Sequence, residues 1–393
     1  MISAETAGGS GWSRPRWIIL IALAAAQFTN IVDFMILMPL GPQLMRTLKL
    51  SPGQFGWVVS VYTFSASGSG LLAALWMDRF DRKRAFLVIY AGLIVGTLAC
   101  GLAWDYHSLL AARALAGAFG GILGGLAMAI VGDIFPPRMR ATATGALMTA
   151  FALASVLGVP LGLALGTAAG WNAPFLALVV LGLVNLLVGA LVVPPIRGHL
   201  EALPDQGTSR PLSEMLGILT EPNHVRAYLL VVSLMIGGFS VIPYISPYLV
   251  SNVGLKEADL PWVYLVGGVL TLVFAPLIGR QADRHGKFRV YALIAPVSAL
   301  LMLATTHLPT AMSVFAAVLT VGFLMLSNAG RMTVALAMVT ACVESRRRGR
   351  FMSLNSSIQH LATGLGASLG GILVTTGADG RLAGYGTVGW IAT

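Results

Sequence analysis

The feature that most constrains this chain is the length of its charge-free apolar runs. Charged residues make up only 10% of the 393 residues and hydrophobic residues 56%, and the charges gather in short clusters between the runs. A run of about 20 residues spans the ~30 Å hydrocarbon core of a bilayer as an α-helix. Inside that core every backbone polar group needs a partner within the chain, which a helix provides. The sequence therefore predicts an all-α membrane protein.

Eleven apolar runs are long enough to cross the bilayer. We expect spans at residues 17–40, 54–76, 85–104, 108–131, 144–168, 172–193, 226–250, 261–279, 288–306, 310–340 and 351–375. A twelfth run begins near residue 383 and stops at Thr393. Roughly ten residues rise only ~15 Å as helix. We therefore expect the last helix to be truncated, either because the chain is trimmed or because this helix is vestigial.

The basic residues predict the orientation of the chain. With a cytoplasmic N-terminus, the inner loops and flanks hold 19 of the 25 Lys and Arg residues, and the outer loops hold four, namely Arg46, Lys49, Lys256 and Arg381. Such a bias is the positive-inside signal. It also explains the net charge of +10 better than nucleic-acid binding does, because an anionic leaflet attracts basic loops. We expect a bacterial inner membrane protein with no nucleic-acid partner.

Other functional classes lack their sequence signatures. Cys100 and Cys342 sit in different apolar runs, which predicts neither a disulfide framework nor a cysteine metal site. We find no nucleotide loop, metal-ligand spacing or nucleophile elbow, so we expect no enzyme activity, no cofactor and no metal. We expect a monomer whose partners are the lipid bilayer, protons and a small-molecule substrate.

The chain divides into two halves that resemble each other. A polar, proline-containing connector at 194–225 separates an N-terminal bundle at 1–193 from a C-terminal bundle at 226–393, which holds five full helices and the start of a twelfth. The loop after the second span, at 74–84, has a counterpart at 279–289 after the eighth. Their Asp-Arg pairs are offset by 205 residues (283 − 78). Internal repeats of this size are typical of transporters.

These repeated loops give the chain a resemblance to the major facilitator superfamily. The second loop matches that family's G-x-x-x-D-R-x-G-R/K-x-R pattern almost fully, whereas the first has Ala74 and Asp81 where glycines are usual. The resemblance implies the major facilitator fold of two pseudo-symmetric six-helix bundles, which work by alternating access.

Three further segments resemble the 12-helix drug:proton antiporter branch of this family. The fifth span carries Gly158-Val-Pro160-Leu-Gly162-Leu-Ala-Leu-Gly166, similar to the antiporter motif. The first span carries Asp33 with Pro39 and Pro42, and the fourth carries an Arg-x-x-x-Gly segment at Arg113. Together they favour a proton-driven exporter over a sugar importer.

Asp33 is the only carboxylate far inside a predicted span. Burial disfavours the charged form of a carboxylate, and an acid inside the membrane is by default a functional hypothesis. We predict that Asp33 couples transport to protons; the alternative is a hydrated structural acid near the outer mouth. Arg113 is its natural partner, and by resemblance it would govern protonation of Asp33. The alternative for Arg113 is a side chain that reaches the outer interface.

A substrate cavity is predicted from polar and aromatic residues within the spans. Gln27 and Asn30 form one polar stripe with Asp33, although either could simply hold a neighbouring helix. The other candidates share amide, aromatic or basic side chains that could face the cavity, face lipid or anchor an interface: Tyr62, Tyr244, Tyr248, Asn328, Arg331, Asn355, Gln359 and His360. Pro243 and Pro247 predict a kink in the seventh span near this cavity.

The paired loops predict a cytoplasmic gate. Acids embedded in basic loops argue for specific charge clusters, because topology alone needs only the bases. By resemblance, such clusters hold the cytoplasmic side shut; the alternative is that the charges only set topology. The predicted gate residues are Asp78, Arg79, Arg82, Asp133, Arg140, Asp283, Arg284, Lys287 and Glu344.

The sequence thus predicts a secondary active transporter that exports a small amphiphilic solute or drug in exchange for protons. A sugar, amino-acid or other metabolite carrier, working by uniport or symport, is the alternative. A membrane sensor that keeps the fold without transporting is a more remote one.

Overall fold

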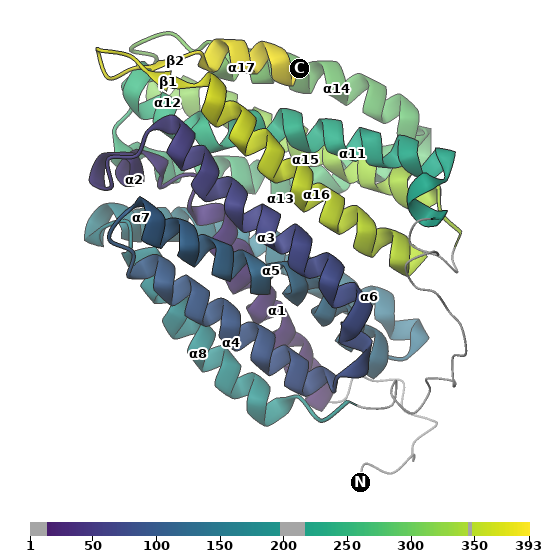
Figure 1. The fold of residues 1–393 in the computed structure, drawn as a ribbon. Helices are drawn as coiled ribbons and strands as arrows, with labels where there is room; N and C mark the ends of the chain where they lie inside the picture. Colours follow the sequence, from purple (N-terminus) through teal and green to yellow (C-terminus); the bar gives the residue numbers. More distant parts are fainter. Residues whose placement is uncertain (1–13, 197–216, 345–347) are drawn as a thin grey trace.

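The computed structural model describes residues 14–196, 217–344 and 348–393, which are almost entirely helical (Figure 1). The long helices are α1 (Arg14–Ile36), α3 (Pro52–Trp76), α4 (Arg82–Gly101), α5 (Tyr106–Ile134), α6 (Pro137–Leu153), α7 (Val159–Ala169), α8 (Ala173–Val192), α11 (Pro222–Val241), α13 (Leu260–His285), α14 (Lys287–Thr306), α15 (Val314–Ala341) and α16 (Arg348–Leu373). Shorter elements are α2 (Gly41–Thr47), η1 (Met77–Arg79), η2 (Ala154–Gly158), η3 (Ile242–Tyr244), α12 (Ile245–Tyr248), η4 (Leu249–Val253), η5 (Glu257–Asp259), β1 (Thr375–Thr376), β2 (Leu382–Ala383) and α17 (Tyr385–Ala392).

The predicted all-α membrane fold is confirmed. Within the described ranges, nine helical segments are long and apolar enough to cross a membrane. Helices α3 and α16, with 25 and 26 residues, pack along each other. Some predicted bounds are wrong by a few residues. The first span is predicted to reach residue 40, but α1 ends at Ile36 before a turn that holds Pro39, a residue that lacks the N–H needed to continue a helix.

Short polar side chains fix where several helices begin. Ser51 accepts a hydrogen bond from the Gln54 amide (3.2 Å), while the Gln54 side chain accepts from the Ser51 amide (2.9 Å). Asp105 and Ser108 form the same reciprocal box at the start of α5. Such boxes satisfy amide groups that have no partner within the helix.

Two spans are broken in the middle. The fifth span consists of α6 and α7 joined by the π-helical turn η2, next to Pro160. The seventh consists of α11, the 3-10 turn η3, α12 and the π-helical turn η4. The predicted kink in this span is confirmed, because Pro243 lies in η3 and Pro247 in α12, and neither can donate the helical hydrogen bond.

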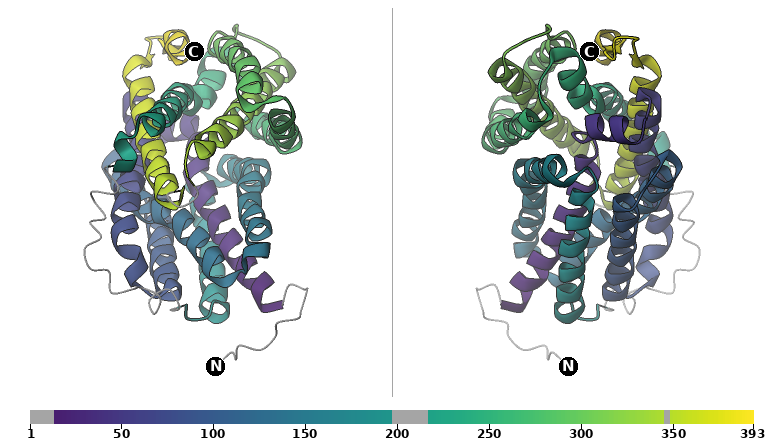
Figure 2. Two further views of the ribbon diagram at one scale, coloured as in Figure 1. Left: turned by 90° about the vertical axis from the view of Figure 1, so that its right-hand side faces the viewer. Right: turned by 90° about the vertical axis from the view of Figure 1, so that its left-hand side faces the viewer.

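The helices pack as two groups that meet along one seam. Helices α1 to α8 pack mainly on one another, as do α11 to α17. In Figure 2 the purple and blue helices of the first half lie below the green and yellow helices of the second. The seam consists of α3 against α16, and of α7 and η2 against α13. The Ser60 hydroxyl lies 2.8 Å from Gly364 O and 2.7 Å from Gly56 O of its own helix, and the Ser67 hydroxyl donates to Ser357 O at 2.8 Å.

The buried core is shared at one end of the molecule and divided at the other. Near α2, one cluster contains Phe55 from the first half and Tyr244 from the second. Toward the opposite end, each half has its own cluster, with Phe86 in the first half and Phe351 in the second. Past Ser67, Leu72 of α3 is 67% exposed. The two halves are therefore packed together at the α2 end and separate at the other.

Candidate functional site

Asp33 and Arg113 form a buried ion pair inside the first half. Asp33 lies in the last turn of α1 and is 1% exposed, and Arg113 lies in α5 and is 0% exposed. Arg113 Nη1 donates to Asp33 Oδ2 (3.0 Å) and to the Asp33 carbonyl oxygen (3.2 Å). These positions exclude the two alternatives that the sequence left open, a hydrated Asp33 at the outer mouth and an Arg113 side chain that reaches the interface.

Thr97 and Tyr62 complete the surroundings of the ion pair. The Thr97 hydroxyl, from α4, lies 3.0 Å from both Asp33 Oδ1 and Leu93 O. The Tyr62 ring, from α3, packs 4.2 Å from the Arg113 guanidinium carbon, in a cation–π contact. Four helices thus enclose a single carboxylate and a single guanidinium.

A polar chain extends from this pair along α1. Tyr62 Oη donates to Asn30 Oδ1 (3.1 Å), and Asn30 Nδ2 donates to Gly120 O (3.2 Å). Asn30 therefore holds α5, which was the alternative that we gave for it. Gln27 lies one turn away against Gly124, with a buried Oε1 that has no hydrogen-bond partner in the described ranges.

Glycines let α5 come close enough to form this site. A Cβ atom at Gly117 would overlap the carbonyl group of Tyr62, and one at Gly121 would lie 2.5 Å from the Cα of Ala66. Small residues at such spacing let helix backbones approach closely. The α3–α5 contact brings the Tyr62 ring over Arg113, so the glycines of α5 are part of the site's geometry.

Two of the guanidinium nitrogens of Arg113 donate no hydrogen bond to the described residues. Its Nε and Nη2 atoms are buried and have no hydrogen-bond partner among the described residues. A buried charge is tolerated only when it is paired. Because Nε and Nη2 have no partner in the described part of the chain, the Asp33 carboxylate bound by Nη1 is the main compensation for the Arg113 charge. A change in the charge of Asp33 would therefore change what holds α1 and α5 together.

Residues 23–330 and 227–392 match the profile of the Major Facilitator Superfamily. The chain belongs to this superfamily. It is 26% identical to the inner membrane transport protein YdhP of Escherichia coli (strain K12), over 91% of this chain and 89% of YdhP. It is 30% identical over 193 residues to an uncharacterized MFS-type transporter of Mycobacterium tuberculosis, of which it covers 33%. The crystal structure of a D-xylose–proton symporter has the same fold, with a TM-score of 0.74 at 16% identity over 96% of both chains.

Membership in the Major Facilitator Superfamily identifies a multi-pass membrane transporter, and the predicted resemblance to this family is confirmed. Its drug:proton antiporter branch remains a prediction. Two of the predicted cavity residues of this transporter, Tyr244 and Tyr248, are buried where helices pack. Tyr244 is 0% exposed at the seam, where its hydroxyl lies 3.1 Å from Ala367 O. Tyr248 donates to Leu308 O (3.0 Å) inside the second half. Both hydroxyl groups thus contact main-chain oxygens, and a role of either ring in a substrate cavity stays a prediction.

The remaining cavity candidates of the second half lie on two helices of this transporter. On α15, Arg331 Nη2 donates to Asn328 Oδ1 (3.0 Å), which also accepts from Ser298 of α14 (3.1 Å). The Asn328 side chain, and with it the Arg331 guanidinium, is therefore hydrogen-bonded toward α14. On α16, Asn355 is 1% exposed, and Gln359 and His360 are half-buried. The Asn355 Oδ1 atom has no hydrogen-bond partner among the described residues.

The predicted cytoplasmic gate residues lie at the end opposite α2, and part of the first-half cluster comes together. Arg82 Nε donates to Asp133 Oδ2 (3.1 Å). The Asp78 side chain lies outside the described part of the chain. Arg140 donates to Phe135 O (2.9 Å), and Arg79 is exposed.

In the second half, Lys287 Nζ donates to Ala337 O (3.3 Å), whereas Asp283, Arg284 and Glu344 are exposed. No ion pair within the described ranges joins Asp283 to Lys287. Whether these charges act as a gate stays a prediction.

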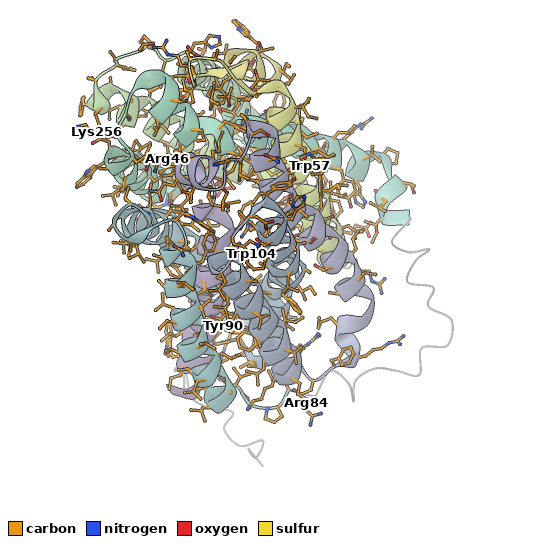
Figure 3. All side chains as sticks on the ribbon, turned by 60° about the vertical axis from the view of Figure 1, so that its left-hand side comes forward. Arg46, Trp57, Arg84, Tyr90, Trp104 and Lys256 are labelled. Atoms are coloured by element: carbon orange, nitrogen blue, oxygen red, sulfur yellow. The ribbon has the colours of Figure 1, made fainter. Side chains whose placement is uncertain are left out.

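An ion pair at the opposite end joins the two halves and was not predicted. Both terminal guanidinium nitrogens of Arg46, in α2, donate hydrogen bonds to the Glu257 carboxylate of η5. The hydrogen bond to Glu257 raises the pKa of Arg46. In Figure 3 Arg46 and Lys256, the neighbour of Glu257, lie at the upper left of the view and Arg84 lies at the bottom. The only sequence signal was the presence of opposite charges in two loops predicted to share the outer face.

Thr97 is the other residue of the candidate site that sequence reasoning missed. It stands among apolar residues in a predicted span, as many membrane threonines do when they bond to their own helix. Its bond to Leu93 O is of that kind, and only its bond to Asp33 distinguishes it.

Proposed function

We propose that this protein is a proton-coupled exporter of a small amphiphilic solute. We place it in a bacterial inner membrane with its N-terminus in the cytoplasm. The observation that carries the proposal is the fully buried Asp33–Arg113 pair inside the first half. Ionisable residues within membrane spans mark proton and substrate pathways, and this pair has both a proton-binding group and a fixed counter-charge.

Proton binding at Asp33 would change the balance of forces between α1 and α5. With Asp33 ionised, the guanidinium has a carboxylate 3.0 Å away. With Asp33 neutral, the same buried cation has the Asp33 carbonyl oxygen and the Tyr62 ring. Leaving a buried charge without its counter-charge costs several kcal/mol (about 3–5). That magnitude is sufficient to reverse a two-state ratio of about 10:1, which takes about 2.7 kcal/mol.

A contact path leads from Asp33 to the seam through the glycine- and proline-containing segment of the fifth span. A Cβ at Gly158 would meet Val32, the neighbour of Asp33, and Phe28, both on α1. The backbone of Ser155 and Val156, in the π turn η2, touches Gly268 of α13 in the second half. The π turn thus lies between the proton-binding helix and the opposite half. This contiguity supports a coupling path, and mutation is the test of it.

The packing supports an alternating-access cycle with the present state open toward the cytoplasm. Near α2, which we place outside, the halves share one hydrophobic core and the Arg46–Glu257 pair. At the other end their cores are separate. In our proposal the proton stabilises one facing state and the substrate stabilises the other, each by its differential affinity.

The test measures protons and transport separately. Purified protein in detergent is shifted from pH 5 to pH 9, and the released protons are counted with a pH indicator dye. We expect Asp33→Asn to release about one proton fewer than Asp105→Asn, a control that removes an exposed acid. In vesicles with an imposed pH gradient, Asp33→Asn should abolish gradient-driven export of a fluorescent amphiphilic dye. If export by Asp33→Asn matches that by Asp105→Asn, the coupling role is wrong.

A metabolite carrier that works by symport remains a second candidate, because the Asp33–Arg113 pair sets coupling to protons and not the direction of solute movement. Imposing the gradient in both directions distinguishes the two. An exporter accumulates solute on the acidic side, whereas a symporter accumulates it on the alkaline side.

A further inference from the structure

The second half has a lipid-facing groove away from the ion pair and the seam. A cavity of about 600 Å³ opens between α13 and α14, with α15 behind it. Its walls are apolar and include Leu277 and Ile278 of α13 and Leu293 and Ile294 of α14, while His285 and Arg289 line it where the two helices join. α14 lies at the edge of the molecule (Figure 1).

The length of the groove along α13 is close to the thickness of one membrane leaflet. Its lining on α13 runs from Phe274 to His285, which is about 16 Å at 1.5 Å per residue. Half of a ~30 Å hydrocarbon core is about 15 Å. Leu293 is 71% exposed and Leu300, two turns further along α14, is 67% exposed. Leu277, on the other wall of the groove, is 45% exposed. Because such side chains face hydrocarbon in a membrane protein, the groove is open to acyl chains at Leu277 and Leu293.

The end of the groove at the turn between α13 and α14 is strongly basic. Arg289 and His285 line it. Along the chain, residues 280–289 also hold Arg280, Arg284 and Lys287, against the single acid Asp283. In the described ranges none of the three arginines forms an ion pair with a carboxylate. The imidazole of His285 donates through Nδ1 to the carbonyl oxygen of its own helix at Gln281 (3.3 Å). This end therefore presents positive charge that no carboxylate in the described ranges pairs with.

We propose that this groove binds one anionic phospholipid of the cytoplasmic leaflet. An acyl chain lies between Leu277 and Leu293, and the phosphate lies beside Arg289 and His285. Charge complementarity selects the headgroup, since each basic residue near an anionic surface contributes attraction that a zwitterionic lipid largely lacks. The apolar length selects a lipid over a free phosphate, because a water-soluble anion would leave most of the groove unfilled. This site does not depend on proton coupling at Asp33.

The test uses the full-length protein, delipidated in detergent and titrated with lipid under native mass spectrometry. The probes are dioleoylphosphatidylglycerol, dioleoylphosphatidylcholine and glycerol 3-phosphate. We expect phosphatidylglycerol to bind at least fivefold more tightly than phosphatidylcholine, and Arg289→Gln to lower its affinity about fivefold. Arg226→Gln removes an exposed arginine from the start of α11 and should change nothing.

A second pair of variants tests the apolar part. Leu277→Trp fills the groove and should weaken binding of both lipids, whereas Leu183→Trp, on the exposed face of α8, should not. Far-ultraviolet circular dichroism verifies that each variant is folded. Equal affinities for the two lipids, equal effects of Arg289→Gln and Arg226→Gln, or full competition by glycerol 3-phosphate would each overturn the proposal.

Discussion

The hydroxyl of Tyr244, in the broken seventh span, lies 3.3 Å from the carbonyl oxygen of Pro52, the first residue of α3 in the other half. The ring is 0% exposed and lies edge-on to Phe55, with the ring centroids 6.0 Å apart. One side chain thus joins the halves at the end that we place outside, and its loss should favour opening there.

Tyr244→Phe removes this hydroxyl and keeps the ring. The single hydroxyl proton is shared between Pro52 O (3.3 Å) and Ala367 O of its own half (3.1 Å). The bond across the seam therefore contributes at most about 1 kcal/mol, and we expect the outward-open fraction to rise by no more than about fivefold. Spin labels at positions 104 and 256, at the outer ends of the two halves, report the separation by pulsed electron resonance. Tyr248→Phe is the control, because its hydroxyl bonds to Leu308 O within the second half. Equal distance distributions in the two variants would contradict the assignment.

The Arg46–Glu257 pair should contribute less, because Arg46 is 67% exposed. Exposed ion pairs are worth about 0–1 kcal/mol and weaken in salt. A double-mutant cycle with Arg46→Gln and Glu257→Gln, read by the same spin labels, should give a coupling energy below about 1 kcal/mol that falls at 1 M salt. The pKa of Arg46 is raised from an already basic value, so its contribution stays constant over neutral pH and is lost only above that value. A loss of coupling between pH 6 and pH 9 would argue against this assignment.

Gly117→Ala should strain the site that holds Asp33. The new methyl group would overlap the Tyr62 carbonyl, and overpacking of a tight contact costs about 1–3 kcal/mol. We expect a lower thermal unfolding temperature in detergent and slower proton-driven transport. Gly125→Ala on the same helix is the control, because nothing lies within 4 Å of its Cβ. If the two variants unfold at the same temperature, the α3–α5 approach is not tight.

Asp105 gives a prediction for pH. Hydrogen bonds from Ser108 lower the pKa of Asp105 from its ordinary 3.8. The folded pKa is thus below the unfolded one, so the cap stabilises α5 above about pH 4 and is lost as the pH falls through the folded pKa. Asp105→Ala should therefore lower the unfolding temperature at pH 7 and have little effect near pH 2. A pH-independent effect of the substitution would be inconsistent with this cap.

Much of the fold follows from the sequence because it depends on local patterns. Charge-free runs predicted the helices, and Pro243 predicted the break in the seventh span. The bounds failed where a capping side chain or a turn decided them, as at Pro39. The site was predicted in part, since Asp33 and Arg113 are rare charges within spans. The bond from Thr97 to Asp33 was not, because it depends on a contact between residues 64 apart.

The repeated loops show how one motif is used in two ways. Gly286, between α13 and α14, has φ of +94°, a conformation that favours glycine, and the family pattern has glycine there. In the first copy Asp81 has φ of −57° and accepts a hydrogen bond from the Arg84 amide (3.1 Å), which caps α4. The departure from the pattern, which the sequence alone left unexplained, is therefore a change from a turn residue to a helix cap.

Three hydrogen bonds across the seam have main-chain oxygens as acceptors, at Pro52, Ser357 and Gly364. A carbonyl group survives nearly every substitution, so a scan that replaces side chains one at a time will register the donors Ser60, Ser67 and Tyr244 and miss their partners. Such a scan would assign each hydrogen bond to its side-chain donor alone. Only a backbone ester substitution, which weakens the carbonyl acceptor, would reveal the contribution of the other half.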